Sequence, residues 1–132
     1  MDKEIKQLIP IFESYPEVKL VYLFGSRANG KTGPLSDYDF AVYLDEKDSL
    51  KRFDIRLNLM GKISSKLKTD AVDLCILNDE YSPEFKYHVV RYGKVIYEVE
   101  PYKLLVEPDI LNDFFDFHQS LIDYKLTKAY DK

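Results

Sequence analysis

The stretch from Leu23 to Asp45 holds the residues whose types and spacing could do chemistry. Asp37 and Asp39 stand one residue apart at the start of an apolar run. Because side chains alternate along a strand, both carboxylates should project from one face while their neighbours enter the core. Asp73 is the other acid embedded in such a run, and a neighbouring strand would bring it to the same face. Three acids are therefore predicted to converge.

Clustered carboxylates repel one another, by roughly 4 kcal/mol per pair at about 4 Å and an effective dielectric constant of about 20. Mg²⁺ reverses this cost, because carboxylate oxygens are its natural ligands and it completes its octahedron with phosphates and water. Two such ions, held by shared aspartates, can clamp the attacking and leaving oxygens of a phosphoryl displacement. The acids thus favour a phosphoryl-transfer site with two Mg²⁺ ions.

A Gly-Ser turn supplies the other half of a nucleotide site. Gly25 lets the backbone turn sharply and approach a ligand, and the N–H groups and the Ser26 hydroxyl that follow can cradle phosphate oxygens. Taken alone, Ser26 is better interpreted as a helix cap, and an Asp-x-Asp pair often occurs by chance. The spacer, the flanking strands and the third acid together favour the catalytic interpretation.

The elements that must position these residues follow from the apolar spacing. Helices are expected at the N-terminus (with Pro10 kinking it or setting its start), over 48–67, over 83–91 and after Pro108, and strands over 18–24, 37–44, 71–77 and 94–99. This alternation predicts an α/β or α+β fold with one small mixed four-stranded sheet and flanking helices.

Two of the expected helices carry apolar stripes, and the stripe of the second is expected to cover the sheet rather than to form a partner interface. The first is Leu50, Phe53, Leu57, Met60, Ile63 and Leu67, and the second is Ile110, Leu111, Phe114, Phe115, His118, Leu121 and Ile122. The whole chain is expected to be one domain, 1–132, with a core over about 15–100 and a C-terminal amphipathic helix over about 108–130.

Composition excludes several classes of protein. The 45% apolar and 32% charged content is typical of a globular protein, and no apolar run is long enough to span a membrane. A net charge of −4 argues against nucleic acid as the main ligand. The one cysteine, Cys75, cannot form an internal disulfide, which is consistent with a cytoplasmic protein.

The stretch "GSRANGKTGPLSDYD" is similar to the Gly-Ser, spacer, Asp-x-Asp signature of the DNA polymerase β-like nucleotidyltransferases, and "YLFGSRA" resembles their minimal (MNT) branch. The likeness continues through "AVDLCIL" to "RYGKVIYE". It implies that Gly25 and Ser26 bind ATP, and that Asp37, Asp39 and Asp73 hold Mg²⁺, with Asp73 also able to act as general base.

Asn29 stands where many minimal members have a second arginine, and Arg27 and Lys31 can partly replace that charge at the nucleotide. Minimal members often pair with a HEPN ribonuclease toxin and transfer AMP to its tyrosine. The resemblance therefore implies an antitoxin in a hetero-oligomer. Two alternatives stay open: a catalytically weak module that neutralises its partner sterically, and a nucleotidyltransferase acting on a small molecule such as an aminoglycoside.

Overall fold

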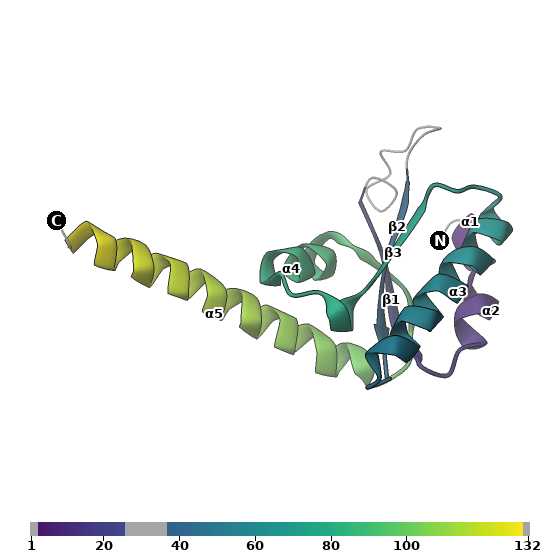
Figure 1. Ribbon diagram of the computed structural model, residues 1–132, viewed down its shortest axis with the longest axis horizontal. Coiled ribbons are helices and arrows are strands. Elements are labelled where there is room, and N and C mark those ends of the chain that lie inside the picture. The colour runs from purple at the N-terminus through teal and green to yellow at the C-terminus, as the bar shows by residue number, and fades with distance from the viewer. Residues whose placement is uncertain (1–2, 26–36, 131–132) are drawn as a thin grey trace.

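The fold is built on one mixed sheet, in a computed structural model that describes residues 3–25 and 37–125, and residues 126–130 by their backbone alone (Figure 1). The strands are β1 (Val18–Phe24), β2 (Tyr38–Leu44), β3 (Val72–Ile76) and β4 (Lys94–Glu98), in the order β3-β2-β1-β4. Strand β1 is antiparallel to β2 and β4, whereas β2 and β3 are parallel. The predicted small mixed sheet is confirmed.

Helices cover both faces of this sheet (Figure 1). On one face lie α1 (Lys3–Lys6), α2 (Ile9–Glu13) and α3 (Ser49–Leu67), and on the other α4 (Pro83–Tyr92) and α5 (Tyr102–Tyr130), with one 3₁₀ turn, η1 (Leu77–Asp79), after β3. Pro10 lies in the first turn of α2, where a missing N–H costs nothing, so it sets the start of that helix. Within residues 3–25 and 37–130, no helix is long and apolar enough to cross a membrane.

Alternation along the strands divides the core into two clusters. Tyr38 and Phe40 face α2 and α3, where Phe12 and Phe40 are both fully buried with ring centroids 6.5 Å apart. Leu20 and Tyr22 face α4 and α5. Each cluster closes one face of the sheet, so a polar residue on a strand can reach solvent only at the ends or the edges of the sheet.

Helix α3 begins and ends at clear local signals, and it buries only part of its apolar stripe. The Asp48 side chain accepts a hydrogen bond from Leu50 N at 3.0 Å, and Lys68 ends the helix in the left-handed conformation. Leu59 and Ile63 are the fully buried positions. The N-terminal part of its apolar stripe stays in solvent, because Leu50, Phe53 and Leu57 are 74%, 51% and 49% exposed.

Helix α5 differs from the prediction. It begins at Tyr102 rather than after Pro108, and among its side chains up to Lys125 only Val106 and Ile110 are buried. The Tyr102 hydroxyl donates to Asp45 at 2.7 Å, which ties the first turn to the end of β2. The rest of the expected stripe does not cover the sheet, because α5 runs past α4 and away from the body (Figure 1).

Candidate active site

Gly25 ends β1 in a conformation and a position that few other residues could take. Its φ is +76°, in the left-handed region that favours glycine. A Cβ placed on Gly25 would lie 2.5 Å from the Asp39 Oδ2. Gly25 therefore lies directly against the Asp39 carboxylate, and the missing Cβ leaves room for that side chain.

Strand β2 orients the two neighbouring aspartates. Tyr38 and Phe40 are buried, whereas Asp37 just before the strand is exposed and Asp39 is half-buried. This is the alternation that the sequence predicts, with carboxylates on one face and aromatic rings on the other. The buried rings anchor the strand, so the backbone under the carboxylates is held firmly.

The crossover from β2 through α3 to β3 brings in the third acid. In the parallel pairing of these strands, Asp39 lies opposite Asp73. Neighbouring strands are about 4.8 Å apart and paired residues share a face, so the two carboxylates extend on the same side of the sheet. Residues 34 positions apart in the chain are thus placed side by side by strand register alone.

The pKa of Asp39 reflects the closeness of the other two carboxylates. The pKa of Asp39 is raised, first by burial and then by the negative charges of Asp73 and Asp37. Within residues 3–25 and 37–130, no group of three or more His, Cys, Asp or Glu side chains is already arranged to hold a metal ion. A divalent cation fits the site by the oxygen donors and by the uncompensated charge, and the side chains would have to close around it.

Ser26, Arg27, Asn29 and Lys31 lie outside the described residues. Their part in binding a nucleotide stays a prediction. Gly25, the last described residue before them, lies at the Asp39 carboxylate.

Cys75, His88 and His118 lie in packed surroundings. Burial is the main cause that raises the pKa of the Cys75 thiol to about 12, which makes it a poor nucleophile. His88 packs against Tyr92 with ring centroids 5.0 Å apart, and His118 against Phe114 at 4.2 Å.

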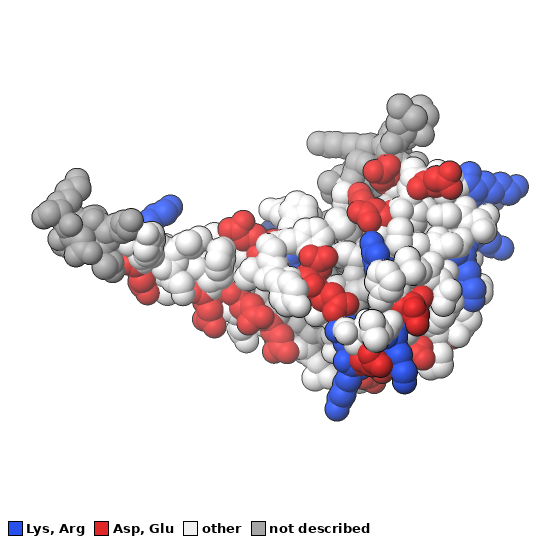
Figure 2. Space-filling model, in the orientation of Figure 1, with Lys and Arg blue, Asp and Glu red and all other residues white. Residues whose placement is uncertain are grey.

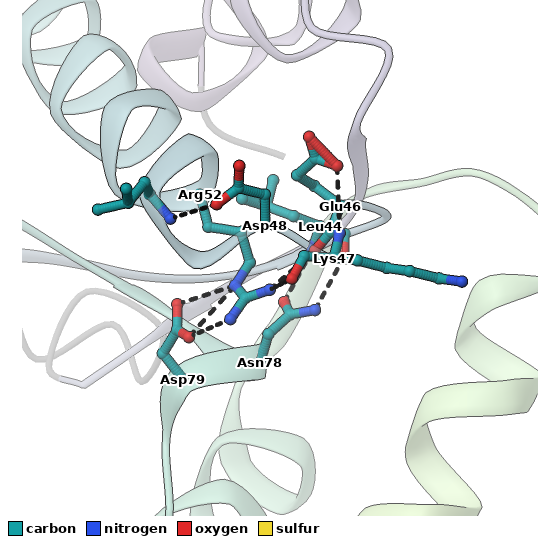
Figure 3. Close-up of polar contacts among 8 residues, drawn as sticks. Leu44, Glu46, Lys47, Asp48, Arg52, Asn78 and Asp79 are labelled. Carbon is teal, nitrogen blue, oxygen red and sulfur yellow. Dashed lines mark hydrogen bonds and ion pairs between the residues drawn. The ribbon is translucent and has the colours of Figure 1, made fainter.

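Arg52 is the centre of a hydrogen-bonded clamp, which no motif in the sequence predicts (Figure 3). Its Nη2 donates to Asp79 at 2.7 Å, and its Nη1 donates to the Glu46 and Lys47 carbonyl oxygens at 2.9 and 3.0 Å. Asn78 joins it by exchanging two hydrogen bonds with the Leu44 backbone. The clamp fastens the start of α3 to the chain after β3 and so fixes the frame around Asp73.

Comparison with known proteins gives consistent matches. Residues 6–102 match the family described as "Polymerase beta, Nucleotidyltransferase". The chain is 36% identical over 104 residues to the protein adenylyltransferase MntA of Aphanizomenon flos-aquae (strain 2012/KM1/D3), covering 72% of this chain and 67% of that protein.

Two solved structures extend the likeness to almost the whole chain. One is a toxin–antitoxin with AMP-PNP, at 28% identity and a TM-score of 0.69, covering 93% of this chain and 96% of that chain. The other is a tri-AMPylated Shewanella oneidensis HEPN toxin in complex with an MNT antitoxin, at 25% identity and a TM-score of 0.66, with the same coverage of both chains.

Proposed function

Because this chain belongs to the polymerase beta nucleotidyltransferase family, we propose that it transfers AMP from ATP to a tyrosine hydroxyl of a HEPN-type toxin. It would thereby act as the antitoxin of that partner and assemble with it. The observation that carries this proposal is the register that sets Asp39 opposite Asp73, directly beneath the Gly25 turn. Acids and a phosphate-binding turn at one point are what nucleotidyl transfer requires.

The candidate residues would have separate roles, some in holding the triphosphate and others in holding the metal. Gly25 and Ser26 would hold the triphosphate through backbone N–H groups, with Arg27 and Lys31 adding positive charge. Asp37, Asp39 and Asp73 would hold Mg²⁺, which when bound neutralises the phosphate oxygens around the reacting phosphorus. Without such a cation the acids would repel the triphosphate.

In the transfer step, the acceptor oxygen forms a bond to the α-phosphorus. The bond between that phosphorus and the oxygen that bridges to the β-phosphorus breaks, and pyrophosphate leaves with its electron pair. The hydroxyl proton passes to the Asp73 carboxylate, the acid on the edge strand. The products are a tyrosyl-AMP and pyrophosphate.

The test is transfer of label from α-phosphate-labelled ATP, with Mg²⁺, into an extract of the source cells. The native protein should label one protein band, and the Asp37→Asn/Asp39→Asn double variant should lose that transfer while keeping its fold. Asp54→Asn, at an exposed acid on α3, serves as the matched control and should transfer normally. Label on RNA or on a small molecule would reject the proposed acceptor, and undiminished transfer by the double variant would reject the site.

Metal binding has a test that does not depend on transfer. Burial and the negative charges of Asp73 and Asp37 raise the pKa of Asp39 and so disfavour its charged form, and the neutral Asp39→Asn should therefore raise the unfolding temperature in EDTA. Adding Mg²⁺ should stabilise the native protein and not the variant. The same response of both proteins to Mg²⁺ would place the cation elsewhere.

Neutralisation of the partner by binding alone is the second candidate. Helix α5 favours it, because Phe115 and Ile122 are 59% and 51% exposed on a helix that projects from the body. In this case the Asp37→Asn/Asp39→Asn variant would still neutralise the toxin in cells. Loss of neutralisation by that variant, with its binding to the toxin intact, would exclude binding alone as the mechanism.

A further inference from the structure

A cleft of about 570 Å³ lies beside Asp73, along the free edge of the sheet. Among the strands that the structure describes, β3 pairs only with β2, and its other edge faces this cleft. Three phenylalanines from three elements contribute to its walls, namely Phe24 at the end of β1, Phe53 on α3 and Phe85 on α4. The space is large enough for an aromatic side chain together with a short length of its backbone.

The order of the strands assigns this cleft to one side of the reaction. Gly25 ends β1, Asp39 lies on β2 and Asp73 lies on β3, so the three follow one another across the sheet. If the triphosphate rests on the Gly25 turn, pyrophosphate leaves on the β1 side. An in-line displacement needs its nucleophile opposite the leaving group, which is the β3 side. The cleft opens there.

The walls suit a flat apolar group that ends in a hydroxyl. Phe24 and Phe85 pack edge to face with centroids 5.7 Å apart, and Phe53 is 51% exposed, with ring surface left for another partner. Asp73, Asp79 and Glu80 line the cleft, and of these carboxylates Asp73 is the one that lies opposite Asp39 in the paired strands. A phenol satisfies both requirements, whereas the short side chains of serine and threonine would leave the aromatic surface in water.

We propose that this cleft receives the acceptor side chain and that Phe53 and Phe85 select an aromatic hydroxyl, a tyrosine presented by the partner. The inference rests on the proposed function for the direction of attack. Arg56 keeps the cleft in shape, because its Nε donates to the Leu74 carbonyl at 2.8 Å and holds α3 against the edge of β3. Phe53 and Phe85 are positioning residues, since they would hold the ring of the acceptor.

An exposed apolar surface on α3 lies next to the cleft and would contact the partner protein. Leu50 and Phe53 follow one another on α3 at helical spacing, and both are largely exposed. Glu80 adds a negative charge to the cleft, and within residues 3–25 and 37–125 it forms no ion pair. A tyrosine on a folded protein, next to a basic residue, complements this arrangement better than a free small molecule does.

The test uses N-acetyl-tyrosinamide as the probe, with N-acetyl-serinamide as the comparison, and compares native protein, Phe53→Ala and Leu57→Ala. Leu57 is the matched control, because it lies on the same helix with 49% exposure but does not line the cleft. Binding is followed by saturation-transfer NMR on the acetyl methyl protons that both probes share, and AMP-PNP affinity is measured in parallel.

We expect Phe53→Ala to weaken binding of the tyrosine probe about fivefold to tenfold, with unchanged AMP-PNP affinity, and Leu57→Ala to change neither. Equal binding by all three proteins, or no binding to the native one, would overturn the inference. Loss of AMP-PNP affinity in Phe53→Ala would overturn it as well and assign the cleft to the nucleobase. Binding as expected but without label transfer to the probe or to any protein would support the cleft and reject the proposed function.

Discussion

Replacing Gly25 by alanine should damage both the fold and the site, to degrees that the structure allows us to estimate. At φ +76° an L-residue costs about 1–2 kcal/mol more than glycine. The new Cβ would lie 2.5 Å from the Asp39 Oδ2, whereas ordinary contact begins at 3.4 Å, so the carboxylate or the turn must move by about 0.9 Å. A displacement of about 1 Å in a catalytic group can lower the rate about 10²-fold.

The assay is label transfer from ATP together with unfolding in urea followed by circular dichroism. Gly25→Ala should lose about 1–2 kcal/mol of unfolding free energy and about 10²-fold in transfer. Gly61→Ala is the control, because a Cβ on Gly61 in α3 would meet nothing within 4 Å. It should gain about 0.5–1 kcal/mol and transfer normally. A Gly25→Ala protein with native stability and native transfer would refute this reasoning.

Three further predictions concern parts of the structure outside the acids. Because the pKa of the Cys75 thiol is about 12, iodoacetamide at pH 8 should label the native protein about 10³-fold more slowly than the urea-unfolded protein. Burial, aided by the hydrogen bond to Glu107, raises the pKa of Tyr22 above its ordinary 10.0, so only the unfolded state ionises there above pH 10. The free energy of unfolding should then fall by up to about 1.4 kcal/mol per pH unit above pH 10. The Tyr22→Phe variant should show a smaller fall over the same pH range. Arg52→Ala should lower the unfolding free energy by about 1–2 kcal/mol in urea, and Arg52→Lys should recover only part of it, because lysine cannot reproduce the fork to Asp79.

The sequence could predict those parts of the site that depend on local alternation. Tyr38 and Phe40 are apolar neighbours of Asp37 and Asp39, and period two in a strand leaves one arrangement open to them. The convergence of Asp73 needed one further assumption, that its strand is a neighbour of β2. The pairing of Asp39 with Asp73 shows that this assumption holds.

Helix α3 shows why the face of a helix was harder to predict. It carries two apolar rows that share Ile63, one through the exposed Leu50, Phe53 and Leu57 and another through the buried Leu59. Both rows have helical spacing, so periodicity alone cannot choose between them. The tilt of α3 against the sheet decides, and that depends on contacts far apart in the sequence.

The start of α5 was missed because Pro108 was interpreted as a helix boundary. Proline removes one N–H and leaves the carbonyl of Leu104 without its helical donor. Leu104 is 77% exposed, so water can take the place of that donor at small cost. The buried Val106 and Ile110 on either side of Pro108 keep the helix continuous through it.

The long reach of α5 means that one continuous helix should have two very different local stabilities. Its first turns are held by Tyr102 and by the buried Val106 and Ile110, and Phe114 stacks on Tyr87 of α4 with centroids 3.8 Å apart. From His118 to Lys125 every side chain is exposed, and acidic groups follow the projecting part in Figure 2. An unsupported helix of this length is marginal in water. Amide protons of α5 should therefore exchange with solvent along a steep gradient, slowly near Ile110 and within seconds beyond Leu121, while the helix keeps its shape on average.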